Sequence, residues 1–124
     1  MRVVTVDGGP LAVSDVVAVA SGEATVVLDP GVTERMAPAR QLVEDVVAED
    51  RTVYGITTGF GRLATTHIDP EQAAQLQVRL LRSHAAGVGT RLSDRSVRAM
   101  LLLRARTLAQ GYSGVRPVVV ERLI

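Results

Sequence analysis

At 124 residues the chain is long enough to bury a hydrophobic core and too short to form two domains. Its 47% hydrophobic residues and net charge of +1 are typical of a folded protein. The chain lacks the excess of charge that is expected of a disordered tail or a nucleic-acid binder. All fourteen basic residues are arginine, and without cysteine or lysine the chain has no thiolate nucleophile, disulfide, cysteine metal ligand or Schiff-base amine.

The first part of the chain predicts a short strand, a helix and a second strand-like segment. Residues 1–6 alternate weakly between polar and apolar side chains and lead into the turn sequence Asp-Gly-Gly-Pro. Ser14 is the expected cap of a short apolar helix through Ala20, and residues 25–28 are rich in β-branched side chains. No segment has the length of a membrane span or the apolar centre of a signal peptide, so we expect a cytoplasmic protein without a membrane partner.

A longer helix and then a loop are predicted for the middle of the chain. Asp29 and Pro30 form a helix-start signature, but Pro38 interrupts the pattern, so the helix either kinks there or begins there. Residues 52–56 are expected to be extended and to lead into a long glycine-rich loop that continues to Ile68. A loop of this length in a compact domain is usually functional or disordered.

Helices are predicted for the rest of the chain. The sequence Asp-Pro-Glu at 69–71 repeats the helix start, and apolar residues then recur at helical spacing up to His84. A serine-capped helix is expected over residues 94 to about 110, and a last helix begins at 116–117. Because apolar residues of this last helix lack a partner sequence before Ile124, we expect residues 1–124 to be a single, truncated, mainly α-helical region with one or two short strands.

The glycine-rich loop holds the main candidate site. Residues 54–61, Tyr-Gly-Ile-Thr-Thr-Gly-Phe-Gly, contain two of the three aromatic side chains of the chain. The loop glycines are Gly55, Gly59 and Gly61. They permit backbone angles closed to other residues and leave little side-chain mass to order the segment, which suits a mobile loop that presents Tyr54 to a pocket. A strained structural turn would have the same composition.

His84 is the second candidate. A histidine on an apolar helix face is more often a core group with satisfied hydrogen bonds than a ligand-binding one. Here, however, the helix breaks beside small residues, in the sequence Ser-His-Ala-Ala-Gly-Val-Gly at 83–89, and such a break can open space for a ligand. Both interpretations stay open on the residues alone.

Three further patterns favour structural interpretations. Residues 59–64 match the glycine spacing of a dinucleotide-binding turn, but the helix that should follow is replaced by a new helix start at Asp69. His67 and Asp69 could bind a metal, yet with two histidines and no cysteine a solvated histidine is favoured and no metal is expected. The arginines of residues 79–116 lack interleaved aromatic residues, so ion pairing is favoured over binding to nucleic acid.

Three motifs in order carry a resemblance to a known family. They are the loop motif at 54–61, the segments at 76–77 (Leu-Gln) and 83–89, and the sequence Gly-Tyr-Ser-Gly-Val-Arg-Pro at 111–117. Together they closely resemble the amino-terminal part of the histidine and aromatic amino acid ammonia-lyases. The resemblance covers nearly the whole chain and is closest to the histidine lyases, which implies a role in histidine catabolism.

The resemblance implies elimination of ammonia by an electrophilic methylidene-imidazolone group, which forms from an internal Ala-Ser-Gly tripeptide. The one Ala-Ser-Gly of this chain is at 20–22, where the first short helix is expected to stop, and in relatives the tripeptide that cyclises comes shortly after the point where this sequence stops. The implied partners are an amino acid substrate, the remainder of the lyase chain and the other subunits of a homotetramer. The 124 residues alone are therefore expected to be inactive.

The resemblance also assigns roles to single residues. Tyr54 matches the loop tyrosine proposed to take the β-proton of the substrate, and His84 matches a position that faces the substrate's side-chain ring. A phenol can serve as this base only where donors and positive charge favour phenolate. Gly55, Gly59 and Gly61 would let the loop close over the substrate.

The substrate is less sharply implied than the family. Histidine lyases commonly carry Asn where Thr57 stands, and the Thr-Thr pair resembles phenylalanine or tyrosine lyases and aminomutases instead. The Ser-His pair at 83–84 favours histidine lyases. We expect a histidine ammonia-lyase, which converts histidine to urocanate and ammonia, with an aromatic lyase or tyrosine aminomutase second. A truncated homologue that binds or regulates a partner is the non-enzymatic alternative.

Overall fold

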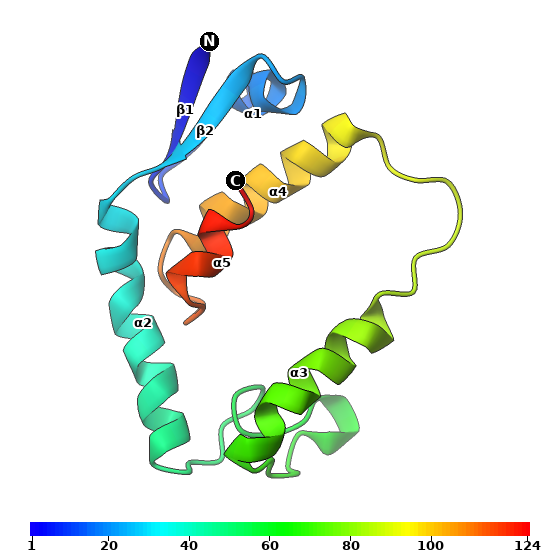
Figure 1. The fold of residues 1–124 in the computed structure, drawn as a ribbon. Helices are drawn as coiled ribbons and strands as arrows, with labels where there is room; N and C mark the ends of the chain where they lie inside the picture. The colour runs from blue at the N-terminus through cyan, green and yellow to red at the C-terminus, as the bar shows by residue number, and fades with distance from the viewer. The chain divides into compact units, whose positions relative to one another are not determined.

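The protein is mainly helical with two short strands, as predicted (Figure 1). The computed structural model describes the backbone of residues 1–124 and every side chain except that of Pro70. In chain order the elements are β1 (Arg2–Val6), α1 (Val13–Ala20), β2 (Ala24–Leu28), α2 (Gly31–Ala48), a 3-10 helix (Gly61–Leu63), α3 (Pro70–His84), α4 (Asp94–Leu108) and α5 (Pro117–Glu121).

The chain divides into two compact units. The first unit joins Met1–Gln41 to Arg91–Ile124, and the second unit consists of Leu42–Thr90. Helix α2 begins in the first unit and ends in the second. The expectation that residues 1–124 are a single region of a longer chain stays a prediction.

The first unit opens with a strand–helix–strand arrangement. β1 and β2 pair in parallel, with Arg2 opposite Ala24 and Val6 opposite Leu28, and α1 is the connection that parallel strands require. The prediction of Ser14 as the cap of α1 was wrong, because Ala12, two residues earlier, takes the cap position and the helix begins at Val13. The carboxylate of Asp15 accepts the Ala12 amide at 3.3 Å and so takes over part of the capping role.

Helix α2 starts at the predicted Asp29-Pro30 signature and passes through Pro38 without ending. The Asp29 carboxylate accepts the amide of Gly31 at 2.8 Å, which caps the helix. The alternative start at Pro38 was therefore wrong. Proline removes one main-chain hydrogen bond, but Val32 and Met36 are 0% and 2% exposed, and their burial keeps the first turns helical.

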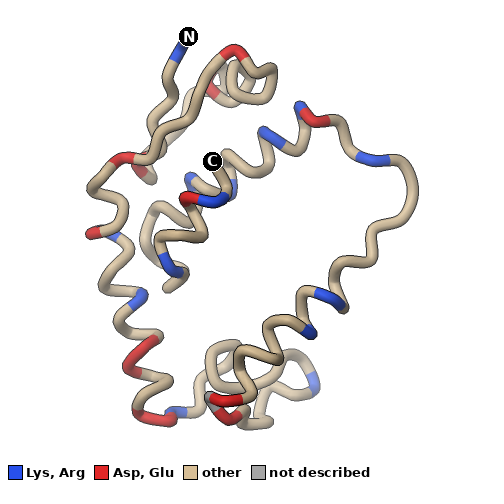
Figure 2. The backbone as a smooth tube through the Cα atoms, viewed as in Figure 1, with Lys and Arg blue, Asp and Glu red and all other residues tan. Residues whose placement is uncertain are grey.

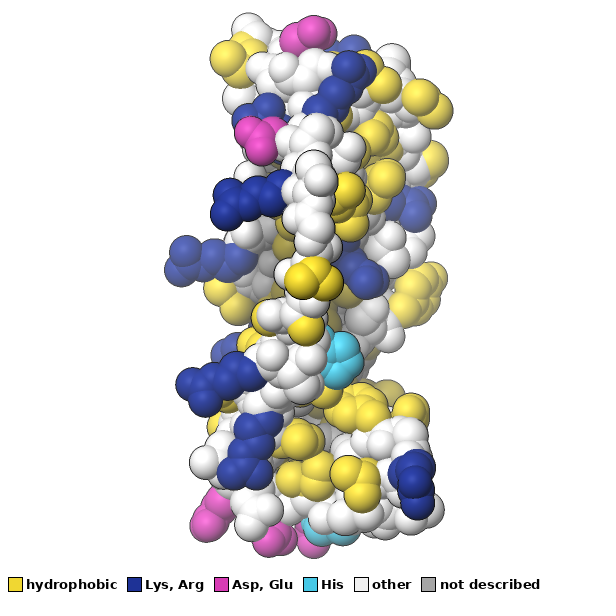
Figure 3. Space-filling view, turned by 90° about the vertical axis from the view of Figure 1, so that its right-hand side faces the viewer, with side chains coloured by type: hydrophobic (Ala, Val, Ile, Leu, Met, Phe, Trp, Pro, Cys, Tyr) yellow, Lys and Arg dark blue, Asp and Glu magenta, His cyan; other side chains and the backbone are white. Residues whose placement is uncertain are grey.

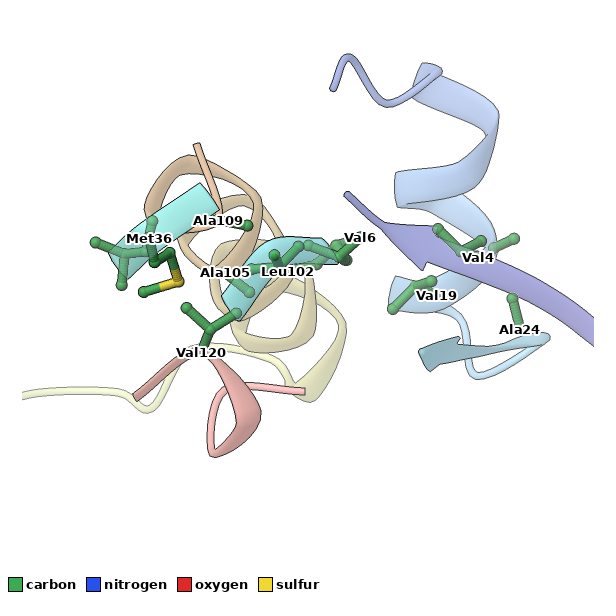
Figure 4. Close-up of a cluster of buried hydrophobic side chains, with 12 residues drawn as sticks. Val4, Val6, Val19, Ala24, Met36, Leu102, Ala105, Ala109 and Val120 are labelled. Carbon is green, nitrogen blue, oxygen red and sulfur yellow. The ribbon is translucent and has the colours of Figure 1, made fainter. Parts of the chain in front are cut away.

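Twelve buried apolar residues form the core of the first unit, and every element of that unit contributes to it. Figure 4 shows Met36, Leu102, Ala105 and Val120 gathered in one cluster. The small side chains of Ala105, on α4, and Ala109, at its C-cap, are both 0% exposed and let neighbouring elements approach closely. This apolar core positions the strands and α1 against α4.

Helices α4 and α5 begin as predicted. Ser93 caps α4 by accepting the amide of Ser96 at 3.2 Å, and the helix ends at Leu108, two residues before the predicted end. α5 begins at Pro117. The prediction that the apolar residues of this helix lack a partner was wrong for Val120, which is fully buried in the core.

Figure 2 shows basic and acidic residues along the chain, and α4 is predominantly basic, with four arginines and one aspartate. α3 has Glu71 in its first turn and Arg82 in its last, an order that complements the helix dipole. Figure 3 shows arginine side chains projecting from the visible face at several separate points. Among the described residues, none of the helices is long and apolar enough to cross a membrane.

Candidate functional site

The candidate site begins in the second unit, where α2 ends. The amide of Arg51 donates to the carbonyl of Val46 at 3.1 Å, and the amide of Asp50 donates to that of Val47 at 3.2 Å. These are the paired hydrogen bonds of a Schellman motif. Asp50 takes the positive φ of 52° that the motif needs, which Asp tolerates better than most residues. The helix end therefore fixes the direction in which the chain enters the loop.

After Arg51 the chain forms a turn. The amides of Ile56 and Thr57 both donate to the carbonyl of Val53, at 3.1 and 3.0 Å. The prediction that residues 52–56 are extended was wrong from Tyr54 on, because these two bonds close a turn over residues 53–57 in which Gly55 has a φ of +75°. The β-branched residues of this segment favoured a strand, but local hydrogen bonds decide its conformation.

Two buried threonines anchor the turn. Thr57 is 5% exposed, and its hydroxyl accepts the amide of Val53 at 2.9 Å and donates to the carbonyl of Arg51. Thr58 is 2% exposed, and its hydroxyl accepts the amide of Gly55 at 3.2 Å and donates to a main-chain carbonyl of the loop. Each hydroxyl thus uses both its donor and its acceptor capacity, as a buried polar group must.

Tyr54 lies between these anchored positions with its side chain turned outward. The side chain is 62% exposed, and its ring stands edge-on to that of Phe60, with centroids 6.1 Å apart and an interplanar angle of 81°. Gly55 has a φ of +75°, and a Cβ at this position would lie 3.4 Å from the Phe60 ring. The structure therefore presents one phenolic oxygen from an anchored turn.

The other two loop glycines have different structural reasons. Gly61 has a φ of +57° and open space around it, so its backbone conformation requires glycine. A Cβ on Gly59 would lie 2.6 Å from that of Leu63, so Gly59 is needed for close approach. The three-residue 3-10 helix that follows provides no α-helix for a dinucleotide pyrophosphate. The hinge role of these glycines stays a prediction.

The second half of the loop pairs back onto the first. Thr58 and His67 form an antiparallel bridge, and the amide of Ile68 donates to the carbonyl of Thr57 at 2.9 Å. His67 Nε2 lies 2.9 Å from the carboxylate of Asp50, with the two side chains 34% and 69% exposed. The aspartate that contacts His67 is thus Asp50, just after α2, and not Asp69, its near neighbour in sequence.

His84 lies at the last position of α3. Ala73, Leu76 and Leu80 form a half-buried stripe on the helix, as predicted, but His84 at its end is exposed. Its Nδ1 lies 2.9 Å from the carbonyl of Leu80 and 3.0 Å from the hydroxyl of Ser83. Because a carbonyl can only accept, Nδ1 carries the proton in this arrangement, and Nε2 of the neutral ring is an acceptor.

Tyr54 and His84 belong to the same unit, but each has its own contacts. The ring of Tyr54 contacts Phe60, and the imidazole of His84 contacts its own helix. Among the described side chains no hydrogen bond or ring contact joins the two. The structure therefore describes two candidate groups, one on a turn and one at a helix end, without a shared contact.

The third sequence motif, residues 111–117, lies in the first unit and has a structural explanation. Gly111 has a φ of +84°, and a Cβ there would lie 2.5 Å from the carbonyl oxygen of Arg35. The guanidinium of Arg40 donates to the carbonyl of Gly114 at 3.3 Å. The motif thus fits the connection between α4 and α5 closely against α2.

Sequence reasoning singled out Tyr54 and His84 but missed the hydrogen-bonding roles of Thr57 and Thr58. The available signal was their spacing, because each hydroxyl reaches an amide three or four residues earlier in the chain. Asp50 was also missed, since a positive φ outside glycine has no clear pattern in a single sequence.

Comparison with known proteins gives consistent matches. A protein-family model described as aromatic amino acid lyase matches residues 11–124. The histidine ammonia-lyase of Streptococcus pyogenes serotype M1 is 42% identical over 99% of this chain, and that of Streptococcus gordonii is 44% identical over the same share. Among solved structures, the tyrosine aminomutase of Streptomyces globisporus is 38% identical over 97% of this chain, with a TM-score of 0.89.

The matches cover only part of the relatives. The chain spans 24% of the length of both histidine ammonia-lyases and 23% of the aminomutase chain, and it matches the amino-terminal quarter of the relatives.

Proposed function

Because this chain belongs to the aromatic amino acid lyase family, we propose that it supplies the loop base and a substrate-facing histidine of a histidine ammonia-lyase. The substrate proposed is histidine, and the products are urocanate and ammonia. The observation that carries the proposal is the exposed phenol of Tyr54, held on an anchored turn in the motif that resembles the family's loop. Identity to histidine lyases along nearly the whole chain supports it.

In the proposed reaction Tyr54 accepts a proton from the β-carbon of the substrate. The electron pair of the broken C–H bond forms the carbon–carbon double bond, while the C–N bond breaks and ammonia departs. An exposed phenol is a weak base, so the remainder of the enzyme must supply the donors and positive charge that favour phenolate. The turn contributes position, because it holds the backbone on both sides of Tyr54.

The family's prosthetic group is proposed to form outside these 124 residues. Methylidene-imidazolone would activate the amine as a leaving group, but the one Ala-Ser-Gly of this sequence, residues 20–22, forms the hydrogen-bonded end of α1, where the amide of Gly22 donates to the carbonyl of Val19 at 3.0 Å. No residue described here stands in for that group. The 124-residue chain alone is therefore proposed to be inactive, and the complete enzyme is proposed to be a cytoplasmic homotetramer.

His84 is proposed to face the side-chain ring of the substrate. Its Nδ1 proton is directed to the carbonyl of Leu80, which leaves Nε2 as an acceptor. An acceptor at this position can take the ring N–H of histidine or the hydroxyl of tyrosine. Phenylalanine offers neither donor, so His84 favours a substrate with a polar ring.

An aromatic lyase or tyrosine aminomutase is the second candidate. Thr57 favours it, since histidine lyases commonly carry Asn at this position, and so does the similarity to the tyrosine aminomutase structure. The non-enzymatic alternative is a short homologue that binds or regulates a partner.

The deciding experiment is a substrate panel on a longer lyase chain that contains residues 1–124. Histidine, tyrosine and phenylalanine are each supplied, and ammonia, the unsaturated acid and the β-amino acid are measured. We expect urocanate and ammonia from histidine as the fastest reaction. Faster release of ammonia from tyrosine would favour the aromatic lyase, and β-tyrosine would favour the aminomutase. Neither ammonia nor a β-amino acid from any of the three would contradict the enzyme assignment.

A further inference from the structure

We propose that Thr57 and Thr58 are positioning residues for Tyr54. Their hydroxyls hold the two main-chain amides that bracket Tyr54 and so fix the direction in which its phenol points. This inference rests on the proposed function, because positioning matters for catalysis only if Tyr54 is the base. The arrangement itself can be tested without substrate.

The geometry places one threonine on each side of the tyrosine. The amide of Val53, before Tyr54, donates to the hydroxyl of Thr57 at 2.9 Å. The amide of Gly55, after Tyr54, donates to the hydroxyl of Thr58 at 3.2 Å. The carbonyl of Val53, in the peptide group before Tyr54, accepts the amides of Ile56 and Thr57, so the peptide groups on both sides of Tyr54 are hydrogen-bonded and its Cα–Cβ bond has a defined direction.

Each hydroxyl is also fixed at its other end. Thr57 donates to the carbonyl of Arg51, directly after α2, and Thr58 donates to the carbonyl of Gly59 at 2.9 Å. Threonine is β-branched and has few favoured χ1 rotamers, so a buried threonine holds its hydroxyl in one position. The turn is therefore tied to the helix end on one side and to the loop on the other.

Tyr54 itself has little to hold it apart from the backbone. Its side chain is 62% exposed, and its only ring contact among the described residues is the edge of Phe60. A side chain with so few contacts depends on its main chain for position. Removal of the hydroxyl at position 57 or 58 is therefore expected to affect catalysis by displacing Tyr54, and not by removing a contact with the substrate.

The test is amide hydrogen exchange by NMR on the 124-residue chain. Thr57→Val and Thr58→Val each remove one hydroxyl at nearly constant volume. We expect Thr57→Val to speed exchange of the Val53 amide about tenfold, and Thr58→Val to do the same for Gly55, as the loss of one hydrogen bond predicts. In both variants the ring signals of Tyr54 should lose the shift that comes from Phe60.

Two matched variants make the result specific. Thr58→Ser keeps the hydroxyl and is expected to restore both the slow exchange of Gly55 and the ring signals of Tyr54. Thr107→Val removes a hydroxyl that donates to a carbonyl at 2.9 Å on α4, in the first unit, and should leave the loop unchanged. If Thr58→Val unfolds the whole second unit, rescue by serine still supports the proposal and failure of that rescue overturns it.

The exchange pattern decides the inference by itself. Unchanged exchange of both amides in the valine variants would overturn it, as would equal effects of serine and valine at position 58. Whether Tyr54 is the base is decided separately, by ammonia release from the longer lyase. In that enzyme the valine variants should lower kcat more than they change KM, and Thr58→Ser should recover most of kcat.

Discussion

Each of the two units is stabilised internally by a different kind of interaction. The first unit buries twelve apolar side chains from two strands and four helices. In the second unit the buried residues with described side chains are Val46, Thr57 and Thr58, so buried hydroxyls take the place of an apolar core. The comparison teaches that the apolar core and the proposed catalytic turn are separated along the chain. The unit with the larger core fixes the framework, and the unit with the candidate base relies on hydrogen bonds.

The largest expected effect on stability is in the core of the first unit. Leu102→Ala should lower the free energy of unfolding by about 2–5 kcal/mol, because it leaves a cavity where the side chain is 2% exposed. Chemical denaturation followed by circular dichroism measures this change. Leu103→Ala is the matched control, since Leu103 is 47% exposed. Equal losses in the two variants would contradict the described core.

A smaller effect is expected where α4 connects to α5. Gly111→Ala should lower the free energy of unfolding by about 1–3 kcal/mol, because the positive φ strains alanine and its Cβ would also lie 2.5 Å from the carbonyl oxygen of Arg35. Gly89→Ala is the control, because Gly89 also has a positive φ, of 97°, but has no neighbouring atom within 4 Å. Thermal unfolding should show the larger loss for Gly111→Ala. If both variants lost the same free energy of unfolding, the contact between position 111 and Arg35 would contribute nothing beyond the backbone strain.

His84→Phe should change substrate preference far more than stability. The imidazole is exposed and contacts only its own helix, so its loss should change the free energy of unfolding by less than about 0.5 kcal/mol. In the longer lyase we expect kcat/KM for histidine to fall relative to that for phenylalanine. An equal fall for every substrate, together with lower stability, would point to a structural role for His84.

At the contact between the end of α2 and the loop, the effect on stability is expected to be smaller than in the core. Asp50→Asn removes the carboxylate that contacts His67 but keeps a residue that tolerates a positive φ, so it should cost less than about 1 kcal/mol. Asp50→Ala should cost about 1–2 kcal/mol more, because alanine is strained in the left-handed conformation. Denaturation at low and high salt measures both variants. Salt should reduce only the ion-pair contribution.

Local signals made much of the fold predictable from the sequence. Asp29-Pro30, Ser93 and Arg116-Pro117 each mark a helix start, and the structure begins α2, α4 and α5 at or next to them. The helical start at Pro38 was wrong, because burial of Val32 and Met36 outweighs the loss of one hydrogen bond. That burial depends on residues distant in sequence, which a local pattern does not contain.

The candidate site was predictable in its residues but not in its geometry. The glycines around Tyr54 singled it out as a candidate, and in the structure its side chain is exposed. The turn itself was missed, because the hydroxyls of Thr57 and Thr58 bind main-chain amides and override the strand preference of β-branched residues. Side-chain bonds to the backbone depend on rotamers, which periodicity does not reveal.

The most direct measurement of the central claim is ammonia release by Tyr54→Phe in the longer lyase. The substitution removes one oxygen from an exposed side chain and keeps the ring that contacts Phe60, so folding should be unchanged. Loss of the base predicts a fall in turnover of about 100-fold or more with a normal unfolding transition. Turnover equal to that of the unchanged enzyme would contradict the claim that Tyr54 accepts the proton.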